Sequence, residues 1–163
     1  SNIIFLYLQY MVRKKNIFDK IGSLIPGYRG YSEREGRRNT DKVLREDLSK
    51  KMYEIEKKIN CSIEDAILAK HFVFMKNMEK SRKKINTLNS KIKYSPQGST
   101  GFFSDEEIKE DELLKVYEID LDIFNLISQI EQKIINENFV VIENLLKDLE
   151  KIIFDRSIFI SKF

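Results

Sequence analysis

Apolar side chains recur at helical spacing along most of the chain. The clearest run is Leu44, Leu48, Met52, Ile55 and Ile59, at intervals of four, four, three and four residues. This spacing puts them on one face of an amphipathic helix, predicted over residues 32–60. Similar stripes predict helices over residues 62–93, 104–136 and 139–159, and a short helix over residues 16–24.

Few residues can interrupt these helices. The 163-residue chain has only six Gly and two Pro, and both are the main helix breakers. Its length allows a sizeable core within a single domain, residues 1–163. We therefore predict an all-α fold, an antiparallel bundle of four main helices with a short N-terminal helix.

Three serines mark where helices are expected to begin. Ser32, Ser62 and Ser104 are each followed, three positions later, by an acidic residue. A serine hydroxyl can bond the backbone of the first turn while the acidic side chain bonds back, which is a capping box.

The first residues form a separate apolar segment. Residues 1–10, SNIIFLYLQY, carry no charge and are too few to span a membrane. Arg13, Lys14 and Lys15 follow the apolar run, whereas a signal peptide has its positive charge before it. We interpret residues 1–15 as a tag remnant or a flexible apolar and basic segment. If residues 1–10 belong to the natural protein, they favour self-association.

Two segments between helices contain unusual residues. In residues 25–31, IPGYRGY, Pro26 and Gly27 suit the central positions of a type II turn. Residues 95–104 hold Pro96, Gly98 and Gly101. Phe102 and Phe103 are too apolar for a solvent-exposed loop, so we expect them to fold back as a plug on the end of the bundle.

One carboxylate lies among apolar positions. Asp120 comes four residues after Val116 and four before Phe124, so helical spacing places it on the buried face. A buried carboxylate needs a partner. An arginine of residues 32–60 or a tyrosine of the turn would supply it, either as a structural ion pair or as part of a polar, anion-binding pocket. The candidate residues are Tyr28, Arg29, Tyr31, Arg37, Arg38, Arg45 and Asp120.

The same stretches carry a family resemblance. The pieces IPGYRGYSEREGRRNTDK, YSPQGSTGFFSDEEI and VYEID resemble a family of small bacterial helical proteins with no established activity. The resemblance covers about residues 17–124. It implies an all-helical cytoplasmic protein and assigns no catalytic residues.

Charge is distributed unevenly along the chain. Residues 1–100 hold 22 Lys and Arg against 11 Asp and Glu, whereas residues 101–163 hold 7 against 15. A basic half can bind nucleic acid or an anionic membrane. The net charges of the two parts, +11 (22 minus 11) and −8 (7 minus 15), nearly match in size. This match instead favours basic helices that lie beside acidic ones in the bundle.

The residues for catalysis or metal binding are sparse. His71 is the only histidine, and Leu68 stands where a Glu-x-x-His metal motif needs a glutamate. We expect His71 to be packed on a helix face. Cys61 lies at a predicted helix junction and has no partner for a disulfide, which suits a reducing cytoplasm. No catalytic residue, metal site or cofactor is predicted.

We therefore expect a cytoplasmic, non-enzymatic helical interaction protein that binds a protein partner or itself and has no transmembrane segment. The alternative is a module for nucleic acid or an anionic membrane surface that uses the basic N-terminal half. An enzyme that uses Tyr28, Arg38 and Asp120 ranks third.

Overall fold

The computed structural model describes residues 2–98, 100–104 and 106–163. Within these ranges the protein is all-α and contains no strand. Its elements are α1 (Asn2–Leu24), η1 (Arg34–Gly36), α2 (Arg37–Leu68), α3 (Phe72–Lys93), η2 (Gly101–Phe103), α4 (Glu110–Ile135) and α5 (Phe139–Ser161).

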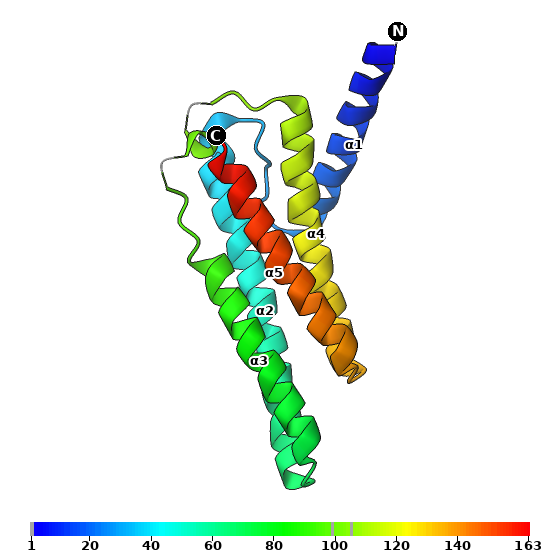
Figure 1. Cartoon of the computed structure of the whole chain (residues 1–163). Coiled ribbons are helices and arrows are strands. Elements are labelled where there is room, and N and C mark those ends of the chain that lie inside the picture. The colour runs from blue at the N-terminus through cyan, green and yellow to red at the C-terminus, as the bar shows by residue number, and fades with distance from the viewer. Residues whose placement is uncertain (1, 99, 105) are drawn as a thin grey trace.

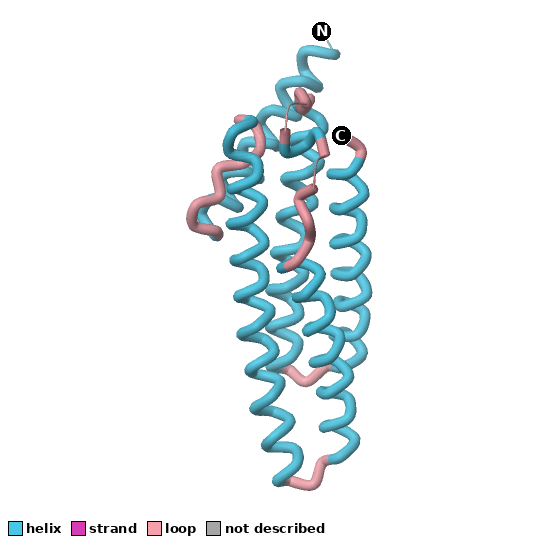
Figure 2. Tube along the Cα trace, turned by 90° about the vertical axis from the view of Figure 1, so that its left-hand side faces the viewer, coloured by secondary structure: helices cyan, strands magenta, loops and turns pink. Residues whose placement is uncertain are grey.

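Two antiparallel helical hairpins make up the bundle (Figure 1). Helix α2 packs along α3, and α4 packs along α5. The two hairpins meet through contacts of α3 with α5 and of α2 with α4. Helix α1 packs against α4, and its N-terminal half projects beyond the bundle. Seen from the side, the long helices run nearly parallel to the bundle axis (Figure 2).

The apolar stripes meet in one core. Leu44, Leu48, Met52, Ile55 and Ile59 of α2 are all buried, as their spacing predicts. They pack with the apolar faces of α3, α4 and α5. The predicted four-helix bundle is therefore confirmed, although α1 is much longer than the short helix expected over residues 16–24.

Two predicted helix starts in the first half of the chain are wrong. Ser32 and Glu35 form no capping box, because the short helix η1 precedes α2 and begins after Glu33. Ser62 lies within α2, where its hydroxyl donates to the carbonyl of Lys58. No Gly or Pro interrupts residues 37–68, so nothing ends the helix at that point.

Helix α2 ends instead in a Schellman motif. Lys70 has a φ of 58°. Its N–H donates to Ile67, and the N–H of His71 donates to Ala66. The same pattern closes α4, where Glu137 has a φ of 57°. In both motifs a charged residue holds the left-handed position that glycine usually takes.

The start of the fourth helix also differs from the prediction. Helix α4 begins at Glu110 after Lys109, and the Glu112 side chain accepts from the Lys109 backbone N–H in a capping box. Ser104 belongs to the segment that follows η2, so its predicted box with Glu107 is wrong.

The two inter-helix segments fold onto one end of the bundle. Gly27 takes a φ of 85°, and the Tyr28 N–H donates to Ile25 across the predicted turn at 3.2 Å. Phe102 and Phe103 are buried, which confirms the predicted plug. Phe102 also packs edge-on against Phe163, so the plug reaches the end of the chain.

Ion pairs connect the basic and acidic parts of the chain. Among the described residues, five ion pairs join a cation of residues 1–100 to a carboxylate of residues 101–163: Arg13–Glu118, Lys14–Glu110, Lys58–Glu131, Lys80–Glu143 and Lys84–Glu150. In each pair the cation comes from α1, α2 or α3 and the carboxylate from α4 or α5. The two charged halves thus lie side by side, as their near balance predicts.

Candidate functional site

Asp120 lies at the centre of a buried polar cluster. It is fully buried in α4, and its Oδ2 accepts hydrogen bonds from the hydroxyls of Tyr28 (3.0 Å) and Tyr31 (2.7 Å). The helical position of Asp120 predicts this burial and a tyrosine of the turn as a partner, and both are present. The bonds connect residues 25–31 to α4.

The cationic partner of Asp120 is Arg156 of α5, which the sequence reasoning missed. Its Nε donates to Asp120 Oδ1 (2.8 Å), its Nη1 to Asp41 Oδ1 (2.8 Å) and its Nη2 to the Tyr31 hydroxyl (3.0 Å). One guanidinium thus joins α5 to α4, to α2 and to the turn. No arginine of α2 bonds Asp120, so that alternative for its partner is wrong.

Asp41 was also missed. It lies in the first turns of α2, and its Oδ2 accepts from Arg45 Nε (2.8 Å) and Gln97 Nε2 (2.9 Å). Through Gln97 the cluster reaches the segment after α3. Every carboxylate oxygen of Asp41 and Asp120 therefore accepts at least one hydrogen bond.

The other predicted arginines mostly hold backbone carbonyls. Arg37 is buried and donates to the carbonyls of Tyr31, Phe102 and Glu106, so it joins the two segments at this end of the bundle. Arg38 donates to Gln97 and to the Gly98 carbonyl.

Arg45 and Arg29 lie at the edge of the cluster and outside it, respectively. Besides Asp41, Arg45 bonds the Lys93 carbonyl (3.1 Å), so it sits at the edge of the cluster. Arg29 is exposed on the turn and takes no part in the bonds around Asp120. Of the seven predicted residues, Tyr28, Tyr31 and Asp120 thus meet directly.

Aromatic rings surround the cluster on one side. The Tyr31 N–H donates to the Tyr117 hydroxyl (2.9 Å), and these two rings stack with centroids 5.8 Å apart. Gly30 permits this approach, since a Cβ atom there would lie 2.4 Å from the Tyr117 hydroxyl oxygen. The glycine also has a φ of 77°, which few other residues adopt.

Burial and charge shift the titration of these groups in different directions. Burial raises the pKa of Asp120, although Arg156 and the two tyrosines oppose the rise. Burial and the Asp120 charge raise the pKa of Tyr31 and Tyr28 well above the usual value, which keeps both hydroxyls protonated as donors.

The second carboxylate behaves differently. Burial alone would raise the pKa of Asp41, but Arg156, Gln97 and Arg45 outweigh it and lower the pKa below its usual value. Burial disfavours the charge of Arg156, yet Asp120, Tyr31 and Asp41 raise its pKa well above the usual value. The two carboxylates and two arginines balance in charge, which suits a structural junction.

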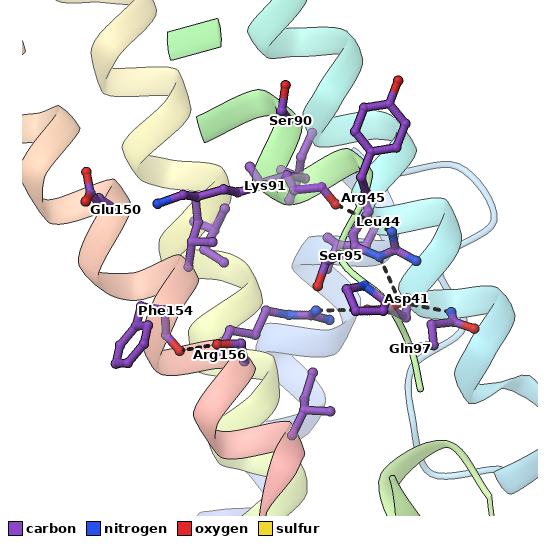
Figure 3. Close-up of a pocket in the computed structure, with 18 of the residues that line it drawn as sticks. Asp41, Leu44, Arg45, Ser90, Lys91, Ser95, Gln97, Glu150, Phe154 and Arg156 are labelled. Carbon is purple, nitrogen blue, oxygen red and sulfur yellow. Dashed lines mark hydrogen bonds and ion pairs between the residues drawn. The ribbon is translucent and has the colours of Figure 1, made fainter. Parts of the chain in front are cut away.

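A pocket opens beside this junction. It has a volume of about 950 Å³ and lies between α2, α3, the segment after α3 and α5. Figure 3 shows Arg156 reaching from α5 toward Asp41, where Arg45 and Gln97 converge on the same carboxylate. The polar cluster therefore forms part of the pocket wall.

The remaining candidates for chemistry lie away from this region. Cys61 is exposed within α2 and not at a helix junction. His71 is exposed in the turn before α3, so the expected packing on a helix face is wrong. Among the described residues no group of His, Cys, Asp and Glu is arranged to hold a metal ion.

Comparisons with known proteins return no matching family model, no matching curated protein and no matching solved structure.

Proposed function

We propose that this is a non-enzymatic binding protein and that the N-terminal half of α1 is its docking element. The exposure of its apolar side chains is the main support for this proposal. Nine of the ten residues from 3 to 12 are apolar or tyrosine, and their exposed fractions run from 37% at Met11 to 83% at Ile3. A stretch of this size marks a contact with another apolar phase.

The arrangement of the segment favours a lipid membrane as that phase. The apolar residues and tyrosines are consecutive over residues 3–8 and again over 10–12, so they cover every side of the helix, whereas a protein partner would need one apolar face. Tyr7 and Tyr10 follow the apolar tip, and then come Arg13, Lys14 and Lys15. This order matches the passage from hydrocarbon through the interface to the phosphate headgroups.

The segment presents a continuous stretch of apolar helix. Ten helical residues extend about 15 Å, which gives a membrane a sizeable apolar surface to contact. Among the described residues, no helix has the length and hydropathy needed to cross a bilayer. The proposed contact is made by residues 3–12 of α1.

The proposal includes a cytoplasmic location and membership of the family of small bacterial helical proteins that the sequence resembles. A single cysteine, exposed and without a disulfide partner, supports the first. Cytoplasmic leaflets carry anionic lipids, which suit the cations at the foot of the segment.

Vesicle co-sedimentation tests the membrane contact. The protein should bind phosphatidylcholine vesicles with and without phosphatidylglycerol. The double variant Phe5→Asp/Leu8→Asp should bind both kinds of vesicle at least about tenfold more weakly, because each aspartate opposes insertion. A matched control is Leu68→Asp/Val73→Asp. These two apolar residues are also exposed, at 83% and 79%, but lie on either side of the turn between α2 and α3. The control should bind like the unmodified protein.

Self-association through the same segment is the second candidate, because exposed apolar helices also pair with each other. Sedimentation velocity without lipid separates the two. A dimer that Phe5→Asp/Leu8→Asp dissociates, together with no vesicle binding, would replace the membrane by a second copy of this chain.

A further inference from the structure

The pocket beside the polar junction has the size of a small-molecule site. Its volume of about 950 Å³ lies near the upper end of the range for ligand pockets. It is distinct from α1, which contributes no residue to its lining. Whatever it binds is therefore separate from the proposed membrane contact.

Most of the inner wall is apolar. Leu44, Leu48, Ile92, Ile123 and Phe103 line it from α2, α3, α4 and the aromatic plug, and all five are buried in the core. These five side chains are only 0–5% exposed, so the apolar surface that a ligand could cover comes mainly from their neighbours at the opening.

Two aromatic side chains lie at its open side. Tyr94 and Phe154 line the pocket and are 72% and 63% exposed. In Figure 3 Phe154 lies on α5, on the opposite side of the pocket from α2. A ligand that covered these rings would remove apolar surface from water.

The charged residues of the lining are mainly cationic. Arg45 and Arg156 are neutralised by Asp41 and Asp120, and Lys84 pairs with Glu150.

Three further exposed lysines line the pocket, Lys91 of α3 and Lys147 and Lys151 of α5, and Lys151 pairs with Asp155. Lys91 of α3 has no ion pair or hydrogen bond with the described residues, and Lys147 of α5 lies 4.0 Å from Glu143. Their positive charge favours an anionic group at the edge of the pocket.

A buried hydroxyl adds a third observation. Thr100 Oγ1 is buried and has no hydrogen-bond partner within the part of the chain that the structure describes. Thr100 also lines the pocket. Buried polar atoms in folded proteins nearly always have a partner, so this hydroxyl marks a polar position in the pocket wall.

We propose that this pocket binds a single-chain amphiphile with an anionic headgroup. The apolar chain lies against the wall between α2 and α5, and the headgroup lies at the edge near Lys91 and Lys147. A fatty acid or an alkyl phosphate has this chemistry.

Calorimetric titration of the full chain with three probes of equal chain length tests the headgroup preference. The probes are laurate, dodecanol and dodecyltrimethylammonium, the two ionic probes kept below the concentration at which they form micelles and dodecanol kept below its solubility limit. Laurate should bind at least tenfold more tightly than the other two. Equal affinity for laurate and dodecanol would overturn the anionic preference, and no binding of laurate would overturn the site.

A charge-reversal pair places the headgroup. Lys91→Glu/Lys147→Glu should weaken laurate binding at least tenfold and change dodecanol binding less than twofold. Both side chains are exposed, so folding should be unaffected. The control Lys50→Glu/Lys76→Glu reverses two exposed lysines outside the pocket and should bind laurate normally. An equal loss in the control would refute the placement.

A blocking variant separates the pocket from α1 as the site of binding. Ser157 is exposed, lines the pocket, and donates to the carbonyl three residues earlier. Ser157→Trp should abolish laurate binding and leave vesicle binding unchanged. Ser23 makes the same local bond outside the pocket, so Ser23→Trp is the control. Unchanged laurate affinity in Ser157→Trp would overturn the proposal, while loss of vesicle binding in Phe5→Asp/Leu8→Asp tests only the membrane contact.

Discussion

A charged residue on an otherwise apolar helix face identifies the centre of this molecule. Asp120 satisfies that criterion in α4, and the structure buries it. Arg156 satisfies it equally well in α5, three residues after Ile153 and four before Ile160. The same spacing rule could therefore have found both members of the central ion pair.

The partner of Asp120 could not be read from spacing alone. Helical periodicity places a residue on a face, but it does not say which faces meet. The arginines of α2 looked suitable because they follow the two tyrosines closely in sequence. In the structure Arg37 instead bonds three carbonyls of the inter-helix segments, which have no helix or sheet to satisfy them.

Replacing Asp120 by alanine should destabilise the protein strongly. The change leaves the buried Arg156 with one carboxylate fewer and removes the acceptor of two buried tyrosine hydroxyls. Removing one partner of a buried pair typically costs about 3–5 kcal/mol. Urea unfolding of Asp120→Ala should show a midpoint lowered to match.

Glu118→Ala is the control for this measurement. Glu118 lies two residues away on α4 and pairs at the surface with Arg13, whose side chain is 67% exposed. A surface pair of this kind contributes less than about 1 kcal/mol. Equal unfolding midpoints for the two variants would contradict the structural importance of the cluster.

At the scale of helices, the predicted apolar faces agree with the structure better than the predicted ends. The two Schellman motifs explain part of this. A glycine at the left-handed position is the usual sign of a helix end, but α2 and α4 have Lys70 and Glu137 there. Without glycine the end of α2 went unnoticed, and a cap at Ser62 was predicted instead.

Glycine at these two positions should stabilise the protein. A residue with a side chain is destabilised by about 1–2 kcal/mol in the left-handed conformation, and glycine avoids this strain. Glycine also has greater freedom in the unfolded chain, which offsets part of the gain. Lys70→Gly and Glu137→Gly should each raise the free energy of unfolding by about 0.5–1 kcal/mol. Urea unfolding measures both.

Lys50→Gly provides the opposite control, since Lys50 is exposed in the middle of α2. Glycine within a helix lowers stability by about 1 kcal/mol. If Lys70→Gly lowered stability by a similar amount, the left-handed end of α2 would be wrong.

At the scale of the whole molecule, the charges of the two halves largely satisfy each other. Helix α3 carries the densest group of lysines and arginines, which is also the strongest argument for nucleic-acid binding. In the structure Lys80 and Lys84 pair with Glu143 and Glu150 of α5, while Arg82 pairs with Glu79 and Glu56. Their charge is therefore partly neutralised before any phosphate approaches.

This pairing predicts weak and strongly salt-dependent binding to duplex DNA. Binding by counterion release needs cations that are available to neutralise phosphates, and Lys80, Arg82 and Lys84 already have carboxylate partners. In a fluorescence-anisotropy titration, any binding at low salt should vanish at about 150 mM, where unpaired surface charges are screened beyond about 8 Å.

Removing the α5 partners with Glu143→Gln/Glu150→Gln should strengthen the low-salt binding, because it frees Lys80 and Lys84. Micromolar binding by the unmodified protein that survives at about 150 mM salt and is lost in Lys80→Ala/Lys84→Ala would instead make α3 a nucleic-acid surface.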